Sequence, residues 1–170
     1  MKRSIAAASL LAIVCAGCTQ STSPTGPTAV PGGSLSLSAQ PTPFKGQLEG
    51  TATVTPLTPP MASVVITASG NATKLGEFTL QVPHLVNFAT RIGTGTYTFT
   101  AANGDTLTAN FAGQAQGTPP NLSIVEHATI TGGTGRFEGA TGSFTVERLF
   151  NQVTGVTTGS FDGVISRGGA

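Results

Sequence analysis

Cysteine is missing from nearly the whole chain: among 170 residues only Cys15 and Cys18 are cysteines, and both lie near the N-terminus. From residue 19 onward the sequence therefore excludes a disulfide framework, a cysteine nucleophile and cysteine metal ligands. Charged residues are also scarce, and their signs nearly balance: the chain has 8 Lys and Arg residues and 7 Asp and Glu residues. Without a basic surplus nothing attracts a phosphate backbone, so we expect no nucleic-acid partner.

Residue types that build helical bundles are few as well. Tryptophan is absent, tyrosine occurs once and phenylalanine 9 times, while threonine occurs 28 times. The 23 Gly and 11 Pro residues together make 34 of 170, and both types interrupt regular helices. This composition argues against a helical bundle, and the abundance of β-branched residues predicts an all-β fold.

No membrane-spanning run is evident at the N-terminus, where the apolar stretch 5–14 has only ten residues. It follows two basic residues and precedes small ones, which predicts a secretory signal peptide over residues 1–17. The tetrapeptide that ends at Cys18 resembles a bacterial lipobox, which implies cleavage before Cys18 and acylation of its thiol. Because leucine is usual where Cys15 stands, ordinary secretion with cleavage nearby stays open.

The next segment, residues 18–43, has no charged residue and is rich in Ser, Thr and Pro. Such composition predicts a flexible tether between the lipidated cysteine and a folded domain over residues 44–167. We therefore expect an exported cell-envelope protein that is held at a membrane through its N-terminal lipid. Without acylation the protein would be secreted or periplasmic.

From residue 44 onward, alternating apolar and polar residues are separated by turn signals at the spacing of a sandwich or barrel. The turn Asn103-Gly104-Asp105 suits a tight hairpin, and the glycines of 132–135 predict another. The short connections imply antiparallel neighbours. The expected strands are 44–55, 62–69, 76–82, 90–101, 106–115, 121–131, 136–149 and 156–166.

A weak repeat places glycine two positions before an aromatic ring inside three of these strands, at 94–97, 141–144 and 158–161. Glycine weakens a strand unless the sheet must bend sharply there, with a neighbouring ring covering the bare backbone. Eight strands, many interior glycines and no candidate helix favour a closed barrel over a sandwich. Closure also removes exposed strand edges.

Three stretches carry a family resemblance: YTFTAANGDTL at 97–107, ITGGTGRFEGATGSF at 130–144 and GSFDGVIS at 159–166. They resemble bacterial proteins with the allene oxide cyclase-like barrel, and the stretch 132–137 is similar to plant dirigent proteins of the same superfamily. The resemblance covers roughly residues 44–167. It implies an eight-stranded antiparallel barrel with a central apolar cavity, trimeric in many plant members, so a homo-oligomer stays open.

Plant cyclase members rearrange a fatty-acid epoxide, and dirigent members orient phenoxy radicals without a cofactor. No stretch of this chain matches the plant catalytic positions, so the resemblance transfers no catalytic residue, and we expect no cofactor.

Four polar side chains share a strand face with apolar ones, which makes them candidate ligand-binding residues. Glu126 lies in phase with the apolar residues of 121–131, Arg148 with those of 144–150, and Arg91 with Tyr97. If that face lines a barrel, Glu126 meets Arg148 or Arg91 beside the Tyr97 hydroxyl, and the cluster orients a ligand with an apolar body and one polar head. The simpler interpretation is an ion pair that plugs the barrel end, or long side chains that reach water.

The two histidines, His84 and His127, are 43 positions apart and have no ligand-like spacing to carboxylates, so a metal site is not expected. Surface or packing roles are predicted for both. The function we expect is a non-catalytic module that binds a small apolar ligand or a partner. The alternative is a cofactor-independent isomerase or cyclase that uses Glu126, which requires an open lumen, whereas a purely structural module predicts a filled one. A surface interaction protein would instead show an apolar patch on its exterior.

Overall fold

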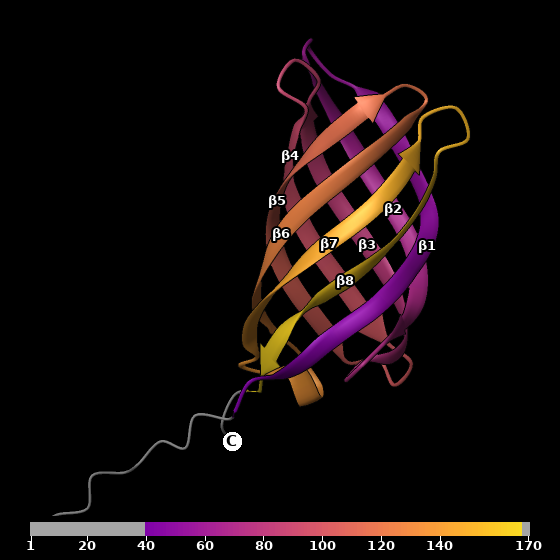
Figure 1. Ribbon diagram of the computed structural model, residues 1–170. Coiled ribbons are helices and arrows are strands. Elements are labelled where there is room, and N and C mark those ends of the chain that lie inside the picture. The colour runs from indigo at the N-terminus through magenta and orange to yellow at the C-terminus, as the bar shows by residue number, and fades with distance from the viewer. Residues whose placement is uncertain (1–39, 168–170) are drawn as a thin grey trace, which may run out of the picture. The chain divides into compact units, whose positions relative to one another are not determined.

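The protein's structure, a computed structural model, describes residues 40–167, which form a closed barrel of eight antiparallel strands (Figure 1). Each strand pairs with its neighbours along the chain, and the last pairs with the first. The predicted all-β, eight-stranded antiparallel barrel is confirmed. The strands are β1 (Thr42–Pro56), β2 (Met61–Ala72), β3 (Gly76–Asn87), β4 (Ile92–Ala101), β5 (Thr106–Thr118), β6 (Asn121–Gly133), β7 (Thr141–Asn151) and β8 (Val156–Ser166).

Closure is made by the ladder between β1 and β8, which runs from Thr42 opposite Ile165 to Thr51 opposite Val156. β1 thus begins two residues before the predicted start at Phe44, because the preceding residues already pair with β8. The ladder leaves neither strand as a free edge, as the glycine content led us to expect.

The predicted signal peptide (1–17), the acylation site Cys18 and the tether as far as residue 39 lie outside the described residues. Within residues 40–167, no helix is both long enough and apolar enough to cross a membrane.

The segment before β7 corrects the prediction of a strand over 136–149. Residues Gly135–Phe137 form a 3-10 turn, η1, and β7 begins only at Thr141. Gly135 and Gly139 have φ angles of 56° and 63°, which a continuous strand cannot accommodate. The turn instead carries the fully buried Phe137 under the barrel.

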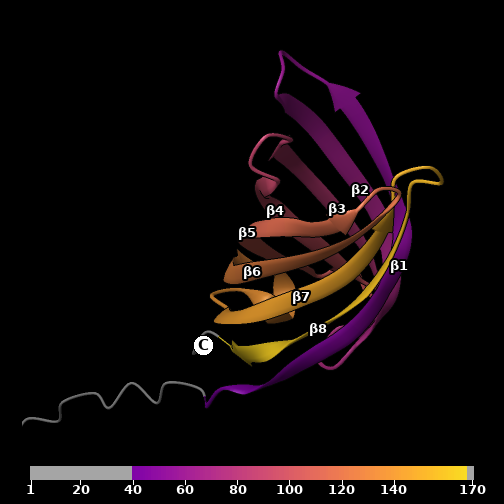
Figure 2. The same ribbon diagram turned by 45° about the horizontal axis from the view of Figure 1, so that its top comes forward.

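The turns alternate between the two ends of the barrel. We call the end with η1 the base and the opposite end the mouth (Figure 1). The base carries connections 73–75, 102–105 and 134–140, and the mouth carries connections 57–60, 88–91, 119–120 and 152–155. When the mouth end is turned forward, the β1–β2 hairpin extends beyond the other hairpins (Figure 2).

Aromatic rings fill the lumen on the base side. Five buried phenylalanines from five strands contact one another with ring centroids 5.0–6.1 Å apart, mostly in tilted or edge-to-face geometry: Phe44, Phe78, Phe99, Phe144 and Phe161. Such pairs stabilise a core beyond the area that they bury. The base half is therefore packed, and any binding space must lie toward the mouth.

Candidate functional site

The mouth half of the lumen contains a cavity of about 420 Å³. Its walls are mainly aliphatic and come from β1, β2, β3, β5 and β6, with Val64, Ile66, Val86, Leu122 and Ile124 among them. The lumen is thus filled at the base and open at the mouth. Sequence analysis left an open and a filled lumen as alternatives, and the barrel combines the two in separate halves.

The floor of this cavity is an ion pair between Glu126 of β6 and Arg148 of β7. Arg148 Nη2 donates to Glu126 Oε1 at 2.7 Å, and Nε donates to Oε2 at 2.9 Å, so the guanidinium grips both carboxylate oxygens. The Tyr97 hydroxyl donates to Glu126 Oε2 as well. Arg148 also contacts Thr157, with 3.3 Å between Nη1 and Oγ1. The prediction that Glu126 meets Arg148 beside Tyr97 is confirmed.

Burial sets the charge states of this floor. Burial and then the negative charge of Glu126 raise the pKa of the Tyr97 hydroxyl well above its usual value, so the phenol stays a donor. Burial alone would lower the pKa of Arg148, but the hydrogen bonds and charge of Glu126 outweigh it and raise that pKa. The floor is therefore a paired, closed network that needs no ligand charge to balance it.

Arg91 does not join the cluster, which corrects the second half of that prediction. It lies in the β3–β4 turn with a φ of 59°, and β4 begins only at Ile92. The strand alternation that placed Arg91 on the same face as Tyr97 therefore does not extend to it. Its Nη1 donates to the carbonyl of Gly117 at 2.8 Å, and its exposed side chain lines the rim of the cavity.

His84 is a lumen residue that sequence analysis did not assign to the site. The predicted strand 76–82 ended at Val82, but β3 continues to Asn87. Proline has no amide hydrogen, and pairing with β4 is interrupted at Val82 and Pro83 before it resumes at His84. The alternation of inward residues from Phe78 through His84 was the signal that could have found it. His127, in contrast, is exposed on the outer face.

The neutral tautomer of His84 follows from its contacts. Nδ1 lies 3.0 Å from the carbonyl oxygen of Val82, and because a carbonyl can only accept, Nδ1 carries the hydrogen and Nε2 keeps a lone pair. Burial lowers the pKa of His84 and outweighs the hydrogen bond to Val82, so the ring is neutral at pH 7. The ring lines the cavity and packs edge-on against Phe111. It offers the cavity a hydrogen-bond acceptor.

Three polar lumen side chains stand directly opposite a glycine of a neighbouring strand. His84 faces Gly95, Glu126 faces Gly113, and Arg148 faces Gly159. A Cβ built on any of these glycines would overlap the facing side chain. Gly95 and Gly159 belong to the predicted repeat. The side chain that faces each of them is polar, His84 or Arg148, and not the aromatic ring that was expected to cover the bare backbone. A Cβ on any of the three glycines would also overlap backbone atoms of the facing strand, so glycine permits the close approach of the two strands at these positions.

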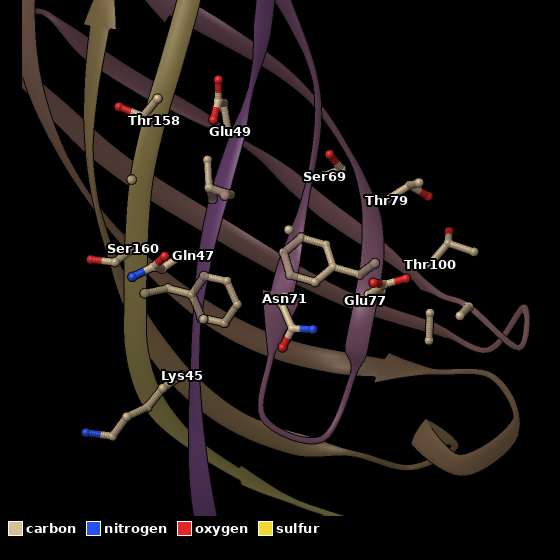
Figure 3. A pocket seen from close by; sticks show the side chains of 18 of the residues that line it. Lys45, Gln47, Glu49, Ser69, Asn71, Glu77, Thr79, Thr100, Thr158 and Ser160 are labelled. Carbon is tan, nitrogen blue, oxygen red and sulfur yellow. The ribbon is translucent and has the colours of Figure 1, made fainter.

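A second hollow, of about 1340 Å³, lies on the outer wall (Figure 3). Figure 3 shows Gln47 of β1 beside Ser160 of β8 and Glu49 beside Thr158, with Ser69 and Thr79 on the next strands, β2 and β3. Its one ion pair, between Lys45 and Asp162, has side chains 57% and 68% exposed. These groups are hydrated and already paired, so this larger hollow lacks the desolvated character of a small-molecule site. The mouth cavity is the better candidate.

Within residues 40–167, no group of three or more His, Cys, Asp and Glu side chains is placed to hold a metal ion.

Comparison with known proteins identifies the fold. No family model and no curated protein matches the chain. The structure of the pterocarpan synthase dirigent protein PsPTS1 matches with a TM-score of 0.58 and 11% identity, over 78% of this chain and 99% of that chain. The pterocarpan synthase dirigent protein GePTS1 matches with a TM-score of 0.55 and 14% identity, over 79% and 90%. The chain therefore has a dirigent-like barrel fold.

Proposed function

We propose that the barrel is a non-catalytic binding module that takes a small, mainly apolar ligand into the mouth cavity. The cavity itself carries this proposal. Its volume of about 420 Å³ lies within the range of roughly 300–1,000 Å³ that is usual for small-molecule pockets. The aliphatic walls favour an apolar body, and the acceptor on His84 suits a ligand with one hydroxyl or other donor.

The bonding of Glu126 favours binding over catalysis. A general acid or base must exchange a proton with a bound substrate. Both oxygens of Glu126 already accept hydrogen bonds from Arg148, and Oε2 also accepts one from Tyr97. An isomerase or cyclase that works through Glu126 would first have to break this network.

Filling the cavity is expected to abolish ligand uptake. Ala115 of β5 lines the cavity, whereas Ala112 of the same strand is exposed on the outer face. We expect the neutral fluorescent probe N-phenyl-1-naphthylamine to bind the unaltered protein and to bind Ala115→Phe at least about tenfold more weakly, since the new ring occupies the apolar space. Ala112→Phe should bind the probe normally. Equal affinities for the two variants would contradict the proposal, and so would no binding to any of the three proteins.

We further propose that the protein is exported and held at the cell envelope by an acylated Cys18. The lipobox-like residues before Cys18 support this, together with the basic and apolar leader. Intact-mass measurement of the protein from the membrane fraction should give a chain that begins at Cys18 and carries diacylglycerol. A soluble product that begins elsewhere would be the signature of ordinary secretion.

A further inference from the structure

The mouth of the barrel is surrounded by exposed apolar side chains. Of the ten large hydrophobic residues that are exposed in residues 40–167, nine lie in the mouth connections or within five residues of them. Three stand at the tips of separate hairpins: Leu57, Phe88 and Val153, with exposed fractions of 45%, 52% and 81%. The exception is Val164, near the base. Exposed apolar groups gathered at one place indicate an interaction surface.

Charge is distributed in the opposite way. The four mouth connections, together with the three residues on each side of them, contain Arg91 as their single charged residue and no carboxylate. The three base connections and their flanking residues contain five charged residues: Lys74, Glu77, Asp105, Arg136 and Glu138. The barrel therefore has a charged end and an apolar end with one cation at its rim.

We infer that the mouth is a membrane-contacting surface, which rests its apolar hairpin tips in the interfacial layer of a lipid bilayer. Apolar side chains with a neighbouring cation and no anion match the lipid interface. There the apolar side chains at the hairpin tips would contact acyl chains, and lipid phosphates would attract Arg91. A protein partner would leave the absence of every carboxylate unexplained. Such contact would place the open cavity against the lipid phase, from which an apolar ligand could enter.

The length of chain before the barrel permits this orientation. β1 begins at the base, so an anchor at Cys18 would join the barrel at the end away from the bilayer (Figure 1). The 24 peptide steps from Cys18 to Thr42 can extend to about 80 Å, whereas the 15 residues of β1 span about 50 Å. An anchored chain can thus reach past the barrel. The membrane-contact inference does not itself depend on acylation or on ligand binding.

Vesicle flotation tests the inference with the anchor removed. Residues 40–167 contain the closed ladder and the described hydrophobic core, so this segment carries what closes the barrel. We expect it to float with vesicles of phosphatidylcholine that contain a minority of phosphatidylglycerol. Leu57→Ser/Phe88→Ser/Val153→Ser should float at least about tenfold less, because three apolar contacts are lost from already exposed positions. Val164→Ser, a matched change at the base, should float as well as the unaltered segment.

Orientation can be measured separately because the chain has no tryptophan. In Phe88→Trp the new indole should shift to the blue on vesicle addition and be quenched by brominated lipid, while in Val164→Trp it should do neither. The inference is overturned if the unaltered segment does not float, if both tryptophans respond alike, or if sedimentation shows a dimer that the mouth substitutions dissociate while vesicle binding is absent. That last result would assign the mouth to a second copy. Probe binding by the Ala115 and Ala112 variants is read independently, so the two proposals can fail separately.

Discussion

Replacing Arg148 with methionine is expected to lower the free energy of unfolding by about 3–5 kcal/mol, measured by urea denaturation. Methionine keeps much of the arginine stem but removes the guanidinium, which leaves Glu126 charged and only 2% exposed with Tyr97 as its remaining donor. A buried carboxylate without its cation retains the full desolvation cost and loses the attraction that offset it. The loss should therefore exceed that of an ordinary lumen truncation.

The double variant Glu126→Gln/Arg148→Met separates the ion pair from simple packing. The amide oxygen of glutamine can still accept the hydrogen bond from Tyr97, and no buried charge is left unpaired. We expect the double variant to unfold within about 2 kcal/mol of the unaltered protein, clearly above the single variant. If Arg148→Met unfolded like the unaltered protein, or if the double variant were as unstable as the single one, the ion pair would not hold the floor together.

The fold was predictable because its determinants are local. Alternation placed Tyr97, Glu126 and Arg148 on the inward face correctly, and the turn at Asn103 and Gly104 fixed a hairpin register. The stretch around Gly135 failed because its glycines suited a tight hairpin equally well. Phe137 packs into the base of the barrel from the η1 turn. The space that it fills is formed by side chains of several strands, and the local sequence does not reveal it.

The site was predictable only in part, for related reasons. Parity told which way Glu126 and Arg148 point, and two opposite charges on the same inward face were expected to pair. Parity says nothing beyond a strand end, so Arg91 was misplaced. It also cannot tell how much of the lumen the side chains fill. The division into an aromatic base and an open mouth depends on side-chain volumes from several strands at one level.

Two glycines on the same strand should respond in opposite ways to alanine, and this contrast tests how the lumen accommodates its polar residues. Gly93 and Gly95 are both half-buried in β4 and neither has a positive φ angle. A Cβ on Gly93 would make ordinary contacts at 3.5–3.6 Å with Val86, His84 and Leu85. A Cβ on Gly95 would overlap the Cβ of His84 and the carbonyl oxygen of Pro83, and would lie 2.7 Å from the Cα of His84.

We expect Gly95→Ala to lower the free energy of unfolding by about 3 kcal/mol, because part of the overlap is with backbone that cannot rotate away. Gly93→Ala should be neutral or should stabilise by about 0.5–1 kcal/mol, since alanine loses less conformational entropy in a strand. Thermal and urea unfolding measure both. Removing the imidazole in Gly95→Ala/His84→Ala should restore little, because the Cβ and Cα of residue 84 and the carbonyl of Pro83 remain in place. Full recovery in that double variant would instead mean that Gly95 is needed only to leave space for the imidazole. Equal stabilities of Gly93→Ala and Gly95→Ala would show that the barrel does not require the close approach of β3 to β4 at Gly95.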